Sequence, residues 1–369
     1  MPDASCFRDY ADAVCDEIES RRDEITASTS VNTLYIGGGT PSVLPLDVLS
    51  RIVKCLSSGG DQIGWEEFTV EVNPEDIVEK GDEYVTGLKE LGVNRISMGV
   101  QSFDDRMLRW MNRRHDSAGA EEAFRILRRC GIDNICIDLI FGLSQLNDDT
   151  WTATIEKALS LGPEHISAYQ LSVEEDSALE RLISKGKYTE ATEDQCREQY
   201  DILCGRLREA GYRHYEISNF ALTGREALHN SAYWKRVPYV GLGPGAHSLS
   251  ASGVRSWNSQ EIPRRLKDGT LATYSREKEI LTPEDIRIER IMLPLRTDIG
   301  IPEEELRSFA DPATVDLLLS AGALVRNGRP NRPSAAAFGD ETPGQAGGDD
   351  LRIPEDRFFT SDEIIRELV

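Results

Sequence analysis

The most informative segment of the sequence is Val31-Asn-Thr-Leu-Tyr-Ile-Gly-Gly-Gly-Thr-Pro-Ser42. Its apolar residues Leu34, Tyr35 and Ile36 have the composition of a β-strand, and three glycines follow them directly. Glycine has no Cβ and tolerates positive φ, so such a loop lets the backbone approach a ligand closely at the end of a strand. The glycine spacing matches neither a Walker loop nor a dinucleotide-binding fingerprint. The stretch predicts a ligand-binding loop, with a plain turn as the alternative.

Strand-like and helix-like segments alternate after this loop, with a repeat of roughly 30 residues that is typical of βαβ units and a parallel sheet. The sequence therefore predicts an α/β fold: a partial (β/α) barrel of the TIM type rather than a flat doubly wound sheet. An amphipathic helix precedes the first strand, with Phe7, Val14 and Ile18 on one face. The later strands are expected at 68–74, 95–102, 134–143 and 164–171, and helices at 46–56, 83–91, 105–111, 118–130 and 149–161.

The pattern changes beyond about residue 280, where short helical segments replace the alternation. We expect two domains: the partial barrel and its extension over 1–250, and a small, mainly helical domain with a hairpin over 251–369. Residues 327–350 are rich in Gly, Pro, Ala and Asp and are predicted to form a disordered loop.

Four polar residues stand near the carboxyl ends of four successive predicted strands, close in the fold to the glycine loop. They are Glu71, Gln101, Asp138 and Gln170. A single polar residue in an apolar strand is usually a satisfied core residue. Four of them favour a shared site, because the carboxyl-terminal rim of a barrel is where ligand-binding groups collect. His229 does not belong to this set of polar residues at strand ends, so by itself it is expected to be an ordinary structural histidine.

The charge balance excludes some classes of partner. Lys and Arg number 42 against 64 Asp and Glu, for a net charge of −22, which argues against nucleic acid or an anionic membrane surface. No apolar run reaches the roughly 18 residues of a transmembrane helix, and the first residues lack the pattern of a signal peptide. The 7 cysteines show no Cys-x-x-Cys pair, which indicates a reducing compartment, so we expect a cytoplasmic protein.

Six motifs occur in order between Gly37 and Ser248 and resemble those of one known family, and the resemblance spans about residues 7 to 325. They are the Gly37–Ser42 loop, Val70-Glu-Val-Asn-Pro74, Gly99-Val-Gln-Ser-Phe103, Asp138-Leu-Ile-Phe-Gly-Leu143, Glu216-Ile-Ser-Asn-Phe220 and Gly241-Leu-Gly-Pro-Gly-Ala-His-Ser248. The family is the radical S-adenosylmethionine proteins related to oxygen-independent coproporphyrinogen III oxidase. Within it, His229-Asn-Ser-Ala-Tyr-Trp234 resembles the signature of the heme chaperone branch.

The resemblance implies two ligands. Heme, or another porphyrin, would contact His229 as a candidate iron ligand, with Tyr233 and Trp234 along the porphyrin face, and would be passed to heme-acceptor proteins. The alternative function is oxidation of coproporphyrinogen III by radical chemistry. S-adenosylmethionine would be bound by a larger set of residues: Gly38, Gly39, Thr40, Glu71, Gln101, Arg113, Asp138, Gln170 and His247.

One expected feature of the family is missing from the sequence. Radical chemistry needs a 4Fe–4S cluster on Cys-x-x-x-Cys-x-x-Cys, which the resemblance places after a first barrel strand and just before the first helix. Cys6 is near that position but its next neighbour, Cys15, is nine residues on, and no other trio has the spacing. We expect a misassigned start codon, which would also remove the first strand; the alternative is a relative without a cluster. Either way, we expect this chain to be inactive in radical chemistry.

Overall fold

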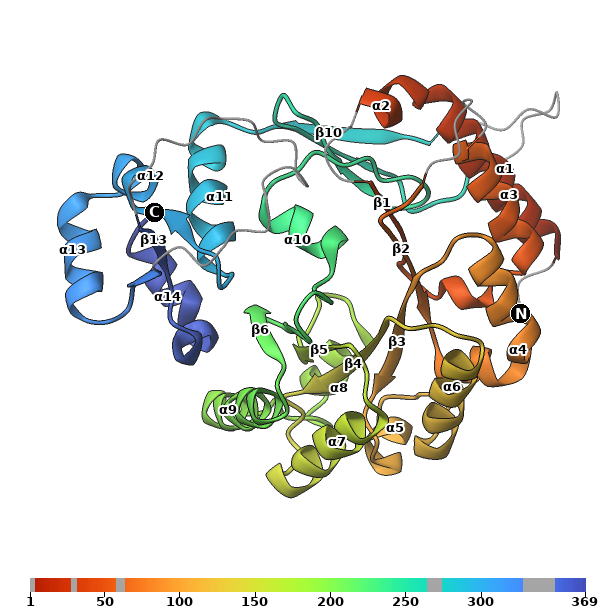
Figure 1. Cartoon of the computed structure of the whole chain (residues 1–369), viewed down its shortest axis with the longest axis horizontal. Helices are drawn as coiled ribbons and strands as arrows, with labels where there is room; N and C mark the ends of the chain where they lie inside the picture. Colours follow the sequence, from red (N-terminus) through yellow and green to blue (C-terminus); the bar gives the residue numbers. More distant parts are fainter. Residues whose placement is uncertain (1–3, 28–31, 58–63, 264–273, 328–348) are drawn as a thin grey trace.

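The computed structural model describes residues 4–27, 32–57, 64–263, 274–327 and 349–369 (Figure 1). The predicted disordered loop at 327–350 falls almost entirely outside these residues. Among the described residues, no helix combines the length and the apolar character needed to cross a membrane.

A seven-stranded sheet curls into a half-barrel at the centre of the molecule (Figure 1). The strand order is β1-β2-β3-β4-β5-β7-β6, in which β1 to β5 run parallel and β7 is antiparallel to both of its neighbours. The prediction of a partial α/β barrel is therefore confirmed. The strands are β1 (Thr33–Ile36), β2 (Glu67–Val72), β3 (Arg95–Gln101), β4 (Ile135–Phe141), β5 (His165–Gln170), β6 (Arg213–Glu216) and β7 (Asn219–Ala221).

Helices cover the outer face of this sheet (Figure 1). Side-chain caps fix several helix starts: Asp116, Asn147 and Thr192 each accept a hydrogen bond from a backbone amide in the first turn. The helices of this layer are α3 (Leu46–Ser57), α4 (Pro74–Glu90), α5 (Asp105–Trp110), α6 (Ser117–Arg129), α7 (Asp148–Leu161) and α9 (Glu193–Glu209). The short helix α8 (Ala178–Ser184) lies in the connection between β5 and α9 and has no buried residue.

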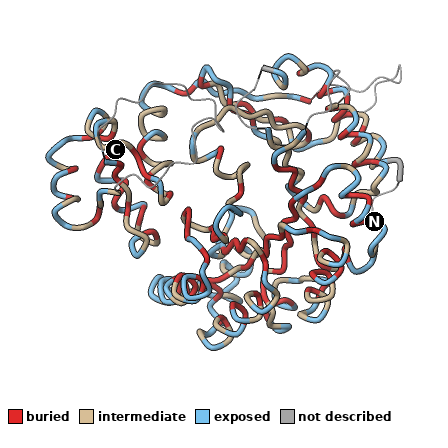
Figure 2. Tube along the Cα trace, in the orientation of Figure 1, coloured by how far each residue is buried: buried red, intermediate tan, exposed pale blue. Residues whose placement is uncertain are grey.

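The hydrophobic core lies between the sheet and these helices, and Figure 2 shows the buried residues following the strands. Side chains alternate between the two faces of a strand. On β2 the apolar Phe68, Val70 and Val72 join this core, whereas Thr69 and Glu71 line a cavity on the inner face. The alternation thus gives the half-barrel a polar interior.

The N-terminal helices pack against a second, three-stranded sheet. Arg21 donates from Nη1 to the carbonyl oxygen of Gly241 at 2.6 Å, and Asn258 Nδ2 donates to Glu17 Oε1 at 2.8 Å. These bonds join segments more than 200 residues apart in the chain. The elements are α1 (Ala4–Ser20), α2 (Arg22–Ala27), β8 (His247–Leu249), β9 (Val254–Asn258) and β10 (Arg276–Ile280).

The C-terminal residues form short helices around a third small sheet of order β11-β13-β12. This part meets the half-barrel where Glu216 of β6 bridges to Thr297. The boundary expected at 250/251 falls between β8 and β9, and the division into two domains stays a prediction. The elements are α11 (Pro283–Leu295), β11 (Ile301–Pro302), α12 (Glu303–Phe309), α13 (Pro312–Ser320), β12 (Val325–Asn327), β13 (Asp350–Arg352), η3 (Glu355–Thr360) and α14 (Ser361–Arg366).

Candidate functional site

The glycine loop lies at the carboxyl end of β1 and leads into the short helix η1 (Pro41–Val43). Gly38 and Gly39 have φ of 80° and 64°, a region that favours glycine. Gly37 is needed for space instead, because a Cβ there would lie 2.3 Å from Cε1 of Tyr35 and 2.7 Å from Oε1 of Glu71. The loop therefore has the close backbone approach that its sequence predicts.

Glu71 organises this loop from the neighbouring strand. Its Oε1 accepts a hydrogen bond from the Tyr35 hydroxyl at 2.7 Å, and its Oε2 accepts one from the Gly38 amide at 3.0 Å. A carboxylate has about four lone-pair sites, so two remain for a ligand's amino or hydroxyl groups. Burial and the nearby Glu71 charge raise the pKa of Tyr35 far above its usual value, so its hydroxyl remains a donor.

Arg113 brings a positive charge to the same rim. Its Nη2 donates to Asn73 Oδ1 at 2.8 Å and to the carbonyl oxygen of Gly99 at 2.7 Å, and Asn73 in turn donates to Thr40 Oγ1 at 3.4 Å. The buried Nε of Arg113 has no hydrogen-bond partner among the described residues. Because an unpaired buried donor of a cation is costly, this geometry fits an anionic group such as the carboxylate of S-adenosylmethionine.

Asp138 lies deeper, on the inner face of β4. It accepts hydrogen bonds from Ser97 Oγ at 3.0 Å and from the Cys136 thiol at 3.2 Å, and burial raises its pKa to about 6. Cys136 also contacts Nδ1 of His165 at 3.0 Å. Burial keeps the pKa of His165 well below its usual value and raises that of the Cys136 thiol, so both groups are neutral.

A cavity of about 240 Å³ opens between these strands and a helix that packs inside the half-barrel, α10 (Leu228–Trp234). Thr69 Oγ1 is buried in its lining, and no described residue gives it a hydrogen bond. Polar groups dominate the lining, which suits a polar ligand or bound water. The lining residues are Tyr35, Thr69, Glu71, Arg95, Ser97, Cys136, Asp138, Ser167, Tyr169, Ala227 and Asn230.

His229 stands in the first turn of α10 and faces β1. Its Nδ1 lies 2.8 Å from Thr33 Oγ1, its Nε2 lies 2.8 Å from the Tyr233 hydroxyl, and its ring stacks on Tyr35 with centroids 5.0 Å apart. Burial lowers the pKa of His229 to about 4, so the imidazole is neutral at physiological pH. Glu67 of β2 fixes this helix by accepting hydrogen bonds from the amides of Leu228 and His229 at 2.8 and 3.1 Å.

The remaining predicted residues divide into two groups: the Gln101 side chain lies above Gly99 together with those of Arg113 and Asn73, whereas Gln170 and His247 lie apart from this cluster. Gln101 ends β3 with a φ of 67°, an unusual value for a residue other than glycine. Gln170 is exposed at the end of β5, with its Cγ beside Gly142 rather than in the cavity lining. His247 stacks on Trp257 in the three-stranded sheet. Their roles as S-adenosylmethionine contacts stay predictions.

Several lining residues were missed from the sequence. Thr69, Arg95, Ser97 and Ser167 alternate with apolar residues along β2, β3 and β5. This period-two polarity marks strands with one polar face, whereas the strands of a fully packed barrel are expected to be apolar on both faces. The same signal could have identified the polar interior before the structure did.

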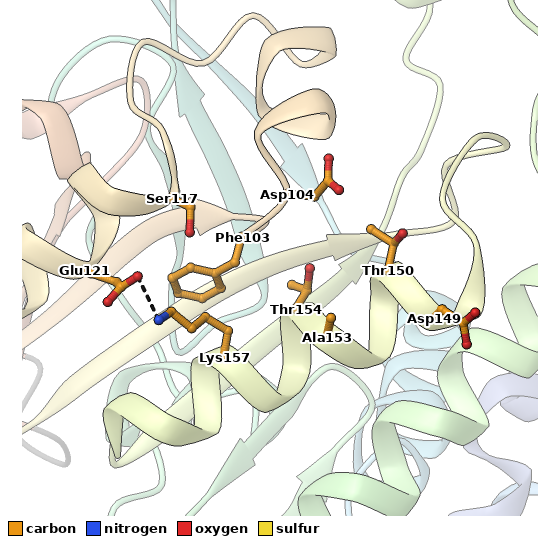
Figure 3. A pocket seen from close by; sticks show the side chains of 9 residues that line it. All are labelled: Phe103, Asp104, Ser117, Glu121, Asp149, Thr150, Ala153, Thr154 and Lys157. Atoms are coloured by element: carbon orange, nitrogen blue, oxygen red, sulfur yellow. Dashed lines mark ion pairs between the residues drawn. The ribbon is translucent and has the colours of Figure 1, made fainter.

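A second cavity, of about 480 Å³, lies outside the sheet between α6 and α7 (Figure 3). Phe103 contributes a ring to it, and Glu121 pairs with Lys157 across it at 2.8 Å. None of the predicted site residues lines this cavity.

The cysteines do not fit a 4Fe–4S cluster. Cys6 is exposed on α1, whereas Cys15, Cys136, Cys196 and Cys204 are buried at scattered positions. Among the described residues, no group of three or more His, Cys, Asp or Glu side chains is placed to hold a metal ion.

Comparison with known proteins gives consistent matches. Residues 7–158 match the Radical SAM superfamily. "Heme chaperone HemW" of Lactococcus lactis subsp. lactis (strain IL1403) is 33% identical over 299 residues, which cover 81% of this chain and 76% of the relative. "Heme chaperone HemW" of Bacillus subtilis (strain 168) is 34% identical over 290 residues, covering 76% and 73%.

Among solved structures, coproporphyrinogen III oxidase (HemN) from Escherichia coli superposes with a TM-score of 0.74 over 98% of this chain and 82% of its own. The two sequences are 19% identical, so the likeness concerns the fold alone.

Proposed function

Because this chain belongs to the family of the heme chaperone HemW within the radical SAM superfamily, we propose that it binds heme and delivers it to acceptor proteins. We further propose that it binds S-adenosylmethionine at the rim of the half-barrel. The two ligands would occupy neighbouring parts of one site, because Tyr35 contacts both Glu71 and His229.

The geometry of the rim supports the S-adenosylmethionine site. Glu71 offers a carboxylate to the ligand's amino group, Arg113 offers an unpaired N–H to its carboxylate, and the Gly38 and Gly39 backbone leaves room beside them. Pairing each ligand charge with its opposite gives charge-assisted hydrogen bonds, which are stronger than neutral ones. The proposed role of this chain is binding, since its residues do not supply a cluster site.

The state of His229 carries the heme proposal. An axial iron ligand must be a neutral imidazole, and burial keeps His229 neutral with a pKa of about 4. The Glu67 cap and the stack on Tyr35 hold its ring in one orientation. The neighbouring Tyr233 is 41% exposed, so the Nε2 side of the imidazole lies close to solvent.

Hemin titration of the wild type and of His229→Ala, followed by the Soret absorbance, tests this proposal. We expect saturable binding by the wild type and at least a tenfold higher Kd for the variant. Added imidazole should restore the spectrum of the variant by filling the space that the side chain leaves. Identical hemin binding by both proteins would overturn the proposal.

Oxidation of coproporphyrinogen III is the less supported alternative. The similarity to the oxidase from Escherichia coli is 19% in sequence and extends to the fold alone. The test of this alternative uses full-length protein with a reconstituted 4Fe–4S cluster: anaerobic conversion of coproporphyrinogen would favour oxidation over heme delivery, and the absence of product would count against it.

A further inference from the structure

Both ring nitrogens of His229 are already engaged. Nδ1 faces Thr33 Oγ1 and Nε2 faces the Tyr233 hydroxyl, each at 2.8 Å. An imidazole binds iron through the lone pair of one nitrogen, so one of these two hydrogen bonds must break before His229 can act as a ligand. The two hydrogen-bond partners, Thr33 and Tyr233, differ in how firmly they are held in place.

Thr33 is the fixed partner. It belongs to β1 and pairs in register with Glu67 of β2, which itself holds the start of α10. Thr33 is also β-branched, so few χ1 rotamers are open to it on a paired strand and its hydroxyl stays beside Nδ1. Breaking the hydrogen bond between Nδ1 and Thr33 therefore costs more free energy than breaking the one between Nε2 and Tyr233.

Tyr233 is the movable partner. It lies in the last turn of the short helix α10, is 41% exposed, and packs edge-on against Tyr239 with ring centroids 4.7 Å apart. Its side chain can rotate toward solvent and hydrogen-bond water instead of Nε2. Breaking this contact therefore costs one neutral hydrogen bond, and the new hydrogen bond between the Tyr233 hydroxyl and water partly offsets that cost.

The acidities of the two hydroxyls indicate the tautomer. A phenol, with an ordinary pKa of about 10, is a far better proton donor than the alkyl hydroxyl of threonine. Burial and Tyr239 raise the pKa of Tyr233 to about 12, so it keeps its proton at neutral pH. Tyr233 therefore donates to a bare Nε2, and His229 donates its Nδ1 proton to Thr33.

We propose that Tyr233 is a removable cap on Nε2 of His229 and that Thr33 is the positioning residue that keeps this nitrogen unprotonated. The inference rests on the proposed heme binding. Rotation of Tyr233 away from Nε2 would free the unprotonated nitrogen through which His229 would hold a heme iron, with no proton to remove from the imidazole. A hydrogen-bond acceptor on the other nitrogen of a ligating histidine commonly fixes its tautomer in metal sites.

The proposal also sets the side from which heme approaches. Nε2 points to the partly exposed Tyr233, while the polar cavity beside Tyr35 and Asp138 has a volume of about 240 Å³. That volume is below the roughly 300–1,000 Å³ of pockets that enclose drug-sized ligands. This cavity is therefore too small to enclose a porphyrin, and a heme held by His229 would reach Nε2 from the partly exposed Tyr233 side.

NMR of the protein labelled with ¹⁵N-histidine tests the tautomer without any heme. The chain has 5 histidines, and His229→Asn identifies the signal of His229 by its loss. We expect a protonated Nδ1 and an unprotonated Nε2 in the wild type, and a mixture of tautomers in Thr33→Val, which keeps the shape but loses the acceptor. A protonated Nε2 in the wild type would overturn the inference.

Hemin titration tests the cap. Tyr233→Phe keeps the ring and removes the hydroxyl, so we expect about fivefold tighter hemin binding, the equivalent of one neutral hydrogen bond, and faster association. Thr33→Val should weaken binding by a similar factor. Tyr239→Phe is the matched control, because Tyr239 contacts Tyr233 but not His229, and it should bind like the wild type.

The outcomes separate this inference from the proposed function. Hemin binding that does not depend on His229 would refute the proposed function, and the NMR tautomer would still decide the protonation inference. Binding that depends on His229 but is weaker or unchanged in Tyr233→Phe would refute the cap and leave the proposed function standing.

Discussion

Gly37 and Gly38 are adjacent glycines that the structure needs for different reasons. A Cβ at Gly37 would collide with Tyr35 and Glu71, whereas a Cβ at Gly38 would meet no atom within 4 Å and suffer only from its φ of 80°. We expect Gly38→Ala to lower the free energy of unfolding by about 1 kcal/mol through backbone strain. Gly37→Ala should cost about 1–3 kcal/mol, as in overpacking, and should also displace Glu71.

Urea unfolding and binding of S-adenosylmethionine, measured on both glycine variants, check this prediction. Equal losses of unfolding free energy and of S-adenosylmethionine affinity in the two variants would show that the contact of Gly37 with Tyr35 is unimportant.

Asp138 makes stability depend on pH. Its pKa is about 6 in the folded protein against 3.8 as the usual value, so the folded state binds the proton more tightly. The carboxyl therefore stabilises the fold at low pH, and this contribution is lost as pH rises through 6. We expect Asp138→Asn to gain stability relative to the wild type between pH 5 and pH 8, by about 1 kcal/mol, because about one pKa unit of the shift lies above pH 5. Urea unfolding of both proteins at pH 5 and pH 8 measures this difference in unfolding free energy. A variant that loses stability relative to the wild type between pH 5 and pH 8 would contradict the prediction.

At the scale of elements, α10 is the part whose position depends most on one side chain. Glu67 is 4% exposed and accepts two amide hydrogen bonds at the start of this seven-residue helix. A helix so short has little stability of its own. We expect Glu67→Ala to cost about 1–2 kcal/mol locally and to speed amide exchange of α10 at least tenfold.

Hydrogen exchange read by mass spectrometry tests this cap. The neighbouring exposed Glu66 provides the matched control, Glu66→Ala, which should leave exchange of α10 unchanged. If the amides of α10 remain protected from exchange in Glu67→Ala, packing against β1 rather than the Glu67 cap holds the helix.

The elements differ in how well they could be predicted. The periodic patterns behind β2 to β5 and α6 to α7 located those elements to within a few residues, because burial on one face imposes a local repeat. The placement of α10 inside the half-barrel could not be predicted that way. It depends on Glu67 and Thr33, which contact His229 across more than 160 residues of chain.

At the scale of the whole molecule, the net charge of −22 controls the response to salt. Like charges on a compact surface repel one another, and salt screens them over about 10 Å at 0.1 M ionic strength. We expect the thermal midpoint to rise by several degrees between 0.05 and 1 M KCl, as measured by calorimetry. A lower midpoint in high salt would show that exposed ion pairs such as Arg129–Asp82 outweigh the repulsion.

The parallel α/β half-barrel, the glycine loop after β1 and the family could be predicted from the sequence, because strand periodicity, glycine chemistry and motif order are local properties of the chain. Glu71, Arg113 and Asp138, which lie at the rim and in the interior, could be identified in the same way. The contacts of Tyr35 with both Glu71 and His229, and those of Thr33 and Tyr233 with the two nitrogens of His229, became visible only in the folded structure. The contact between Thr33 and His229 spans 196 residues, and such a pairing arises from the curl of the sheet and the packing of α10, which no local pattern encodes.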